Sequence, residues 1–117
     1  MSVYEEVQTE RVRQNEKWGE QNHPIIDPDT FTHGGVSFAG REVCEWYGVP
    51  SEKDACEAYE CAVSRGDVAW ADVLIEELAE ALEAATRSES EARAELVQLA
   101  AVAIAAVECI DRGAQRG

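Results

Sequence analysis

Glutamates with a spacing suited to metal binding are concentrated between residues 76 and 95. Glu76, Glu77 and Glu80 form the pattern E-E-x-x-E, which in a helix places carboxylates on adjacent turns of one face, and Glu83 continues the stripe. No lysine or arginine lies between residues 70 and 86 to compensate these charges. Hard divalent cations prefer oxygen ligands, and Mg²⁺ is commonly held by a few carboxylates. The stripe is therefore typical of a site for Mg²⁺, or for Mn²⁺ in its place.

A second pair of oxygen-bearing side chains follows a few residues later. Glu95 and Gln98 are three residues apart, so both could face the acidic stripe from a neighbouring helix. Gln98 would gain a partner there, since a buried amide without one costs ~1–3 kcal/mol. A different interpretation also fits, because glutamates opposite Leu74, Leu78 and Leu82 are equally typical of an amphipathic helix that faces water.

Capping residues and helix periodicity predict the elements that position these side chains. Glycines at the ends of helical segments and Ser or Asp before them mark the boundaries, and alternating strand patterns are nearly absent. We expect an all-α bundle of four to five helices in one domain over residues 1–117, with 67–87 and 88–112 as a central antiparallel hairpin. The helices are expected at 2–18, 51–66, 67–87 (capped by Asp67) and 88–112 (ending before Gly113), with a further turn or two over 41–47. Two prolines and three glycines predict an irregular loop at about 20–40.

The last predicted helix is apolar on all sides over much of its length. From Leu96 to Val107 the only polar side chain is Gln98. A helix without a solvated face must be surrounded by other elements, and a chain of this size has little material to surround it. We therefore expect a homo-oligomer; a monomer with one central helix is the alternative.

Composition excludes several classes of protein. The 117 residues include 10 Lys and Arg against 24 Asp and Glu, a net charge of −14, which disfavours binding to a nucleic acid polymer. No apolar run approaches the ~20 residues of a membrane span, and the first residues lack the pattern of a signal peptide. We expect a cytoplasmic protein that does not associate with membranes. The four cysteines contain no C-x-x-C pair, so a zinc knuckle is disfavoured, and we expect free thiols that are mostly buried.

Two segments resemble a known enzyme family. IEELAEALEA followed by ELVQLAAVAIAAVE resembles the MazG-like branch of the all-α nucleoside triphosphate pyrophosphohydrolases, and ERVRQNEKWGEQNHP is similar to the small phage and actinobacterial members. The family signature is E-E-x-x-E on one helix and E-x-x-D on the next. This sequence matches it at Glu76, Glu77, Glu80 and Glu95, and has Gln98 where the family has Asp. The resemblance covers residues 5–24 and 67–112.

The resemblance implies a function. A MazG-like enzyme would hydrolyse a nucleoside triphosphate to the monophosphate and pyrophosphate, as a dimer or a dimer of dimers. Glu77 and Glu80 would be catalytic, and Mg²⁺ would be bound by the signature residues Glu76, Glu77, Glu80, Glu95 and Gln98. Because Gln98 departs from the signature, a catalytically weak or inactive nucleotide-binding, metal-binding or regulatory module is the alternative. A helical interaction protein with a basic partner is a third hypothesis.

The resemblance also suggests residues that contact the substrate. The block K-W-G-E-Q-x-H could supply phosphate contact and base stacking, and a tryptophan at the start of the acidic helix could line the nucleotide pocket. Ordinary ion pairs and packing are the alternatives for these side chains. For Arg11 and Arg13 we favour ion pairs with nearby glutamates, and for Trp70, as for Trp46 and Tyr59, we favour a place in the core. The candidate substrate-binding residues are Lys17, Trp18, Gln21, His23 and Trp70.

Overall fold

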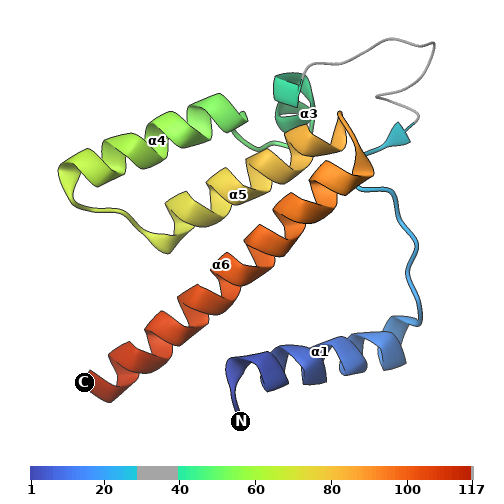
Figure 1. Cartoon of the computed structure of the whole chain (residues 1–117), viewed down its shortest axis with the longest axis vertical. Coiled ribbons are helices and arrows are strands. Elements are labelled where there is room, and N and C mark those ends of the chain that lie inside the picture. The colour runs from blue at the N-terminus through green and yellow to red at the C-terminus, as the bar shows by residue number, and fades with distance from the viewer. Residues whose placement is uncertain (29–39, 117) are drawn as a thin grey trace. The chain divides into compact units, whose positions relative to one another are not determined.

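The structure, a computed structural model, describes residues 1–28 and 40–116, and among these the side chains of all but 114–116 (Figure 1). The described part of the chain is helical without any strand, which confirms the predicted all-α class. Residues 19–27 form no helix, and the remainder of the predicted loop, 29–39, lies outside the described residues. The helices are α1 (Val3–Trp18), α3 (Gly40–Trp46), α4 (Glu52–Arg65), α5 (Trp70–Ala85) and α6 (Glu89–Arg116).

The chain divides into two compact units. One comprises Met1–His23 together with Ala103–Gly117, and the other comprises Pro24–Val102. The first therefore contains α1 and the last turns of α6, and the second contains α3, α4, α5 and the first turns of α6. Over the described residues, no helix combines the length and apolar character needed to cross a bilayer.

Serine caps begin α1, α4 and α6, two of them at places that the sequence predicts. The Ser51 hydroxyl accepts a hydrogen bond from the Asp54 N–H at 3.1 Å, and the Ser88 hydroxyl accepts one from the Glu91 N–H at 3.1 Å. Such bonds satisfy donors that have no partner within the helix. Gly66 ends α4 in the left-handed conformation (φ 74°, ψ 24°), as predicted. Ser2 caps α1 in the same way.

Two predicted boundaries are wrong. The helix expected from Asp67 begins at Trp70, because the Asp72 carboxylate accepts from the Ala69 N–H at 2.9 Å and Asp67 instead pairs with Arg65 at 3.1 Å. The final helix does not stop before Gly113 but continues to Arg116. A glycine costs helix stability without forbidding helical backbone angles, and Gly113 does not adopt a positive φ.

The core of the Pro24–Val102 unit is built from small side chains. Cys44, Ala55 and Ala79 are buried together, with Val49 and Leu82 packed against them. Small residues on facing helices allow the backbones to approach closely, and α4 and α5 lie side by side with α3 against the end of α5 (Figure 1). This packing brings the acidic face of α5 close to α4.

Several aromatic and sulfur side chains are more exposed than predicted. Trp46, expected in the core, is 63% exposed. All four cysteines are free, as expected, but only Cys44 is buried. With so few large side chains buried, the core depends on close helix contact through alanines.

Candidate metal site

Three glutamates from two helices meet in the Pro24–Val102 unit. One carboxylate oxygen from each of Glu77, Glu80 and Glu95 lies within 4.8 Å of the others. Glu77 and Glu80 are one turn apart on α5, and Glu95 comes from the second turn of α6, after a short connection. All three side chains are half-buried. The predicted pairing of Glu95 with the acidic stripe is therefore present, and we call these three residues the acidic cluster.

Oxygens in and beside the acidic cluster lack partners. Glu76 Oε2, Glu77 Oε2 and Glu95 Oε2 are shielded from solvent, and none accepts a hydrogen bond from the described residues. The ion pairs of the described chain involve Arg13, Arg41, Arg65 and Arg87, each with an acid outside the cluster. A carboxylate removed from water without a counter-charge is costly. The cluster therefore requires either protons or a cation.

The proton affinity of Glu80 reflects this crowding. Its pKa is raised from 4.5 to about 8, first by burial, then by the charge of Glu77 and by a hydrogen bond with Glu95. That hydrogen bond joins two carboxyl groups, so one of them must carry a proton to donate. Without a cation, the cluster holds a proton near neutral pH. A divalent cation can replace this proton and neutralise two charges at once.

Glu76 and Gln98, the other two predicted ligands, do not belong to the acidic cluster. Glu76 is outside the group of three, and its pKa is raised by burial and then by the charges of Glu77 and of Glu60 on α4. Gln98 is exposed, so the expectation that burial would force its amide to find a partner is wrong. One turn before Glu95, Ala92 is fully buried, which shows that α6 turns its Ala92 side inward and carries Gln98 toward solvent. The ligand roles of Glu76 and Gln98 stay predictions.

Glu83, the last member of the acidic stripe, is already satisfied by the protein. Its Oε2 accepts a hydrogen bond from the N–H of Glu52, the first residue of α4, and lies 3.7 Å from the Cys44 thiol. Burial and the charge of Glu83 raise the pKa of Cys44 to about 11, so the thiol stays protonated and donates to the Glu83 carboxylate. A Cβ on Gly40 would lie 2.5 Å from Glu83 Oε1, so the glycine leaves room for this carboxylate.

Helix α4 contributes two side chains near the acidic face that the sequence reasoning missed. The Cys56 Sγ lies 3.6 Å from Glu60 Oε1. The pKa of Cys56 is raised by burial, then by Glu60, and further by the charges of Glu76 and Glu80. A thiol among carboxylates stays protonated, which disfavours it as a metal ligand. No local pattern could have placed α4 here, because the contact depends on how α4 packs on α5.

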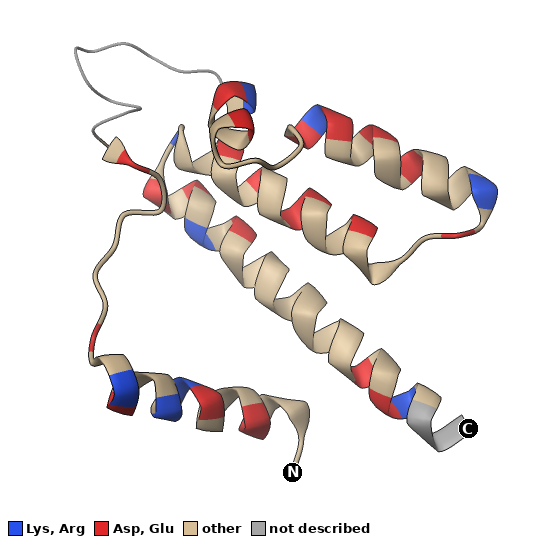
Figure 2. Ribbon diagram, turned by 180° about the vertical axis from the view of Figure 1, so that it is seen from behind, with Lys and Arg blue, Asp and Glu red and all other residues tan. Residues whose placement is uncertain are grey.

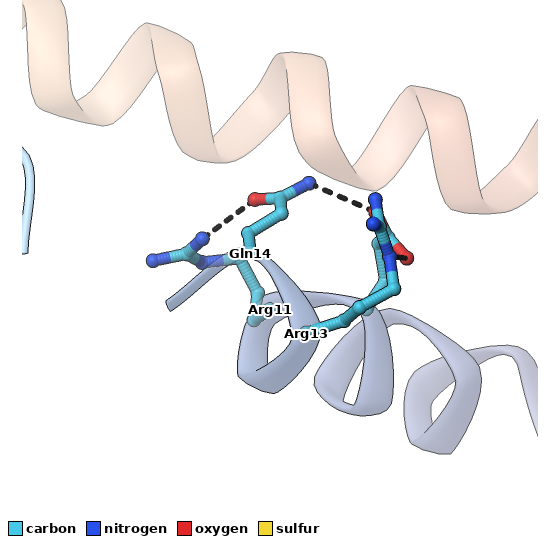
Figure 3. A network of polar contacts seen from close by, with 4 residues as sticks. Arg11, Arg13 and Gln14 are labelled. Carbon is cyan, nitrogen blue, oxygen red and sulfur yellow. Dashed lines mark hydrogen bonds and ion pairs between the residues drawn. The ribbon is translucent and has the colours of Figure 1, made fainter. Parts of the chain in front are cut away.

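The predicted substrate-binding block lies in the other unit, on and after α1. Arg11 donates to Gln14 Oε1 at 2.6 Å, and Arg13 donates to Glu10 at 2.7 Å (Figure 3). The ion-pair interpretation is therefore confirmed for Arg13, whereas for Arg11 it is wrong, because Arg11 donates to the amide oxygens of Gln14 and Asn15 instead of to a glutamate. Lys17 Nζ lies 4.9 Å from the centre of the Trp18 ring, a cation–π distance.

The other candidate substrate residues are accessible. Gln21 lines a hollow of about 730 Å³ with Arg11, Gln14, Asn15, Gly19 and Glu20. Trp18 is 52% exposed, Trp70 is 38% exposed, and His23 is exposed as well. The block belongs to the Met1–His23 unit and Trp70 to the Pro24–Val102 unit. Their roles in binding a nucleotide stay predictions.

Comparison of the chain with protein-family models, with curated proteins and with solved structures gave no match. The functional argument therefore depends on the acidic cluster and on the residues around it.

Proposed function

We propose that this protein is a Mg²⁺-dependent nucleoside triphosphate pyrophosphohydrolase that releases the nucleoside monophosphate and pyrophosphate. The observation that carries the proposal is the acidic cluster, in which three half-buried carboxylates from two helices converge without a cationic partner among the described residues. The likeness of the E-E-x-x-E and E-x-x-Q segments to the MazG-like signature supplies the reaction.

The residues present fit a hard divalent cation. Glu77, Glu80 and Glu95 would hold it, since all three offer oxygen and two have an oxygen that is shielded and unpartnered. Opposite ligands of Mg²⁺ are about 4.2 Å apart, twice a bond of ~2.1 Å, so oxygens within 4.8 Å need only small side-chain rotations to close on the ion. Mn²⁺ makes slightly longer bonds and should fit as well.

The protein's own groups suggest how the reaction would proceed. When bound, Mg²⁺ would neutralise phosphate charge and lower the pKa of a water molecule. Glu77, Glu80 and Glu95 would hold the ion, which would displace the proton that Glu80 holds without it. Glu77 and Glu80 are the catalytic candidates, and one of them would accept a proton from the attacking water. Without a cation, a chain with a net charge of −14 would repel a triphosphate.

One observation favours a second candidate function. Gln98 stands where the family signature has Asp, and its side chain is exposed. A site with one fewer carboxylate binds Mg²⁺ more weakly, since ligand charge contributes to affinity. A metal-binding or nucleotide-binding regulatory module with little turnover is therefore the alternative.

Self-association as a homodimer or a dimer of dimers is part of the proposal. The reason is that several apolar residues of α6 remain exposed in the single chain, among them Val97 at 56% and Ile110 at 68%. Exposed apolar residues that continue along one helix are more typical of an interface than of a solvated surface.

The decisive experiment measures turnover and metal binding on the same purified protein. A panel of nucleoside triphosphates would be incubated with Mg²⁺ or Mn²⁺, and monophosphate and pyrophosphate would be quantified. Equal release of the two products supports the enzyme. Calorimetric titration with Mg²⁺ separates the alternatives, because binding without turnover indicates the module. If the protein shows no Mg²⁺ binding and no turnover, both functions are refuted.

A further inference from the structure

Helix α4 is held in the Pro24–Val102 unit by few apolar contacts. It lies beside α5 (Figure 1), yet its buried side chains are only Ala55 and Ala62, together with the capping Ser51 before its first residue. The other side chains of α4 are partly or fully exposed. An alanine removes little apolar surface from water when it is buried, so these residues stabilise the docked helix much less than leucines would.

Charge opposes the contact between α4 and α5. Helix α4 has four acidic and two basic residues, and α5 has five acidic residues and no basic one (Figure 2). Within the described part of the chain, no ion pair joins the two helices. The pKa of Glu76 on α5 is raised by burial, then by the charge of Glu77, and further by two acids of α4. The like charges of the two helices are therefore close enough to repel each other.

A single carboxylate offsets this repulsion. Among the described residues, one hydrogen bond joins α4 to α5, and it runs from the N–H of Glu52 to Glu83 Oε2. Glu52 is the first residue of α4, where N–H groups have no acceptor within the helix, and the bond to an ionised acceptor is of the strong kind. The same oxygen accepts from the Cys44 thiol of α3. Glu83 therefore connects the N-terminal end of α4 to both other helices.

The segments on either side of α4 can change direction. Residues 47–51 and 66–69 form no α-helix, and each segment contains a glycine with a positive φ, Gly48 at 73° and Gly66 at 74°. Hinges are commonly a few loop or element-terminal residues that absorb a change in backbone angles. We infer that α4 opens as a unit away from α3 and α5, and that the bond between Glu83 and the Glu52 N–H holds it closed.

Opening of α4 would expose a thiol that is otherwise inaccessible. Cys44 is fully buried and packs with Ala55 of α4 and Ala79 of α5. Burial, followed by the charge of Glu83, raises its pKa to about 11, so in the closed form the thiol is both covered and protonated. Alkylation requires an accessible thiolate. The rate of Cys44 alkylation therefore measures how often α4 is open.

Alkylation with iodoacetamide at increasing urea concentration tests the inference. Cys44 would be the single thiol, in a background of Cys56→Ser, Cys61→Ser and Cys109→Ser, and each rate would be divided by that of the fully unfolded chain. We expect a rate nearly independent of urea at low concentrations, because opening one helix exposes little surface, and a steep rise where the whole chain unfolds.

Variants separate the opening of α4 from a general loss of stability. Glu83→Ala should raise the low-urea rate by roughly tenfold or more, and Glu83→Gln by less, since it keeps an acceptor oxygen. Glu57→Ala, the same substitution at an exposed position of α4, should leave the rate unchanged. Ser88→Ala removes the cap of α6 and destabilises the whole chain, but it should not change the low-urea rate, because that cap stays intact when α4 opens.

Hydrogen exchange gives an independent result on the unchanged chain. Amides of α4 should exchange faster than those of α5, and with a shared weak dependence on urea. The inference is overturned if Cys44 alkylation and exchange in α4 follow global unfolding at every urea concentration, or if Glu83→Ala leaves the low-urea rate unchanged. It uses no residue of the acidic cluster and no metal, so its failure would not affect the proposed function.

Discussion

The two ends of the acidic stripe on α5 contain the same residue type in very different situations. Near the C-terminal end, Glu83 accepts a hydrogen bond from the first N–H of α4 and lies beside the Cys44 thiol. Earlier on the helix, Glu77 and Glu80 meet Glu95 and find no donor except a shared proton. The spacing of glutamates along a helix therefore does not distinguish a structural carboxylate from one available to a ligand.

The difference has a thermodynamic consequence. A carboxylate that accepts from a helix N-terminus stabilises the fold through a charge-assisted hydrogen bond and through the helix dipole. A group of carboxylates without donors destabilises the ionised protein until a cation arrives. We expect Glu83 to matter for stability without metal, and the acidic cluster to matter for metal binding and turnover.

Removing a charge from the acidic cluster should have the largest effect. Glu77→Gln or Glu80→Gln should lower pyrophosphate release by roughly 100-fold or more, because metal stabilisation of the transition state is worth several kcal/mol. Rates would be measured at saturating Mg²⁺. Glu57→Gln, an exposed glutamate on α4, is the matched control and should retain full activity. Unchanged turnover in both cluster variants would remove the acidic cluster from the mechanism.

Removing Glu83 should produce the next largest effect, on stability. Glu83→Ala leaves the Glu52 N–H without its acceptor and should lower the free energy of unfolding by roughly 1–3 kcal/mol, measured with urea in metal-free buffer. Glu83→Gln keeps an acceptor oxygen and should cost less. Glu80→Ala in the same buffer should not destabilise the protein, since it removes repulsion. If Glu80→Ala were the more destabilising change, the contrast between the two ends of α5 would be wrong.

The pH dependence of stability should sharpen the same contrast. The pKa of Glu80 is raised from 4.5 to about 8 in the folded chain, so between these values the folded state binds more protons than the unfolded state. Without metal, the contribution of Glu80 to the free energy of unfolding should therefore be greatest below about pH 4.5 and should decline toward pH 8. Unfolding midpoints of the unchanged chain and Glu80→Gln would be compared across this range, and the variant should show the shallower decline. Saturating Mg²⁺ should reduce the difference between the two proteins.

The smallest effect is expected at Gln98. Because its side chain is exposed, Gln98→Ala should change Mg²⁺ affinity by no more than about twofold, the range usual for surface substitutions. Calorimetric titration would measure this, with Glu95→Gln as the comparison one turn away. A loss of affinity as large as that of Glu95→Gln would show that Gln98 turns inward and coordinates the ion.

Much of the local structure was predictable, and the errors have local causes. Ser51, Ser88 and Gly66 act where expected because a cap needs only its own backbone and a neighbour three or four residues away. Asp67 was misassigned because Asp72 can satisfy the same end of α5 from inside the helix. Gly113 was misassigned because a glycine permits a helix end without requiring one.

The helices and the common face of Glu77 and Glu80 follow from the residue pattern, because helical periodicity depends only on residues within a few positions. Three further features appear only in the folded chain: Glu95 completes this group, the Glu52 N–H of α4 donates to Glu83, and Gln98 faces solvent. These outcomes depend on which segments pack against α5, and packing is set by close contact among residues far apart in the chain, such as Cys44, Ala55 and Ala79.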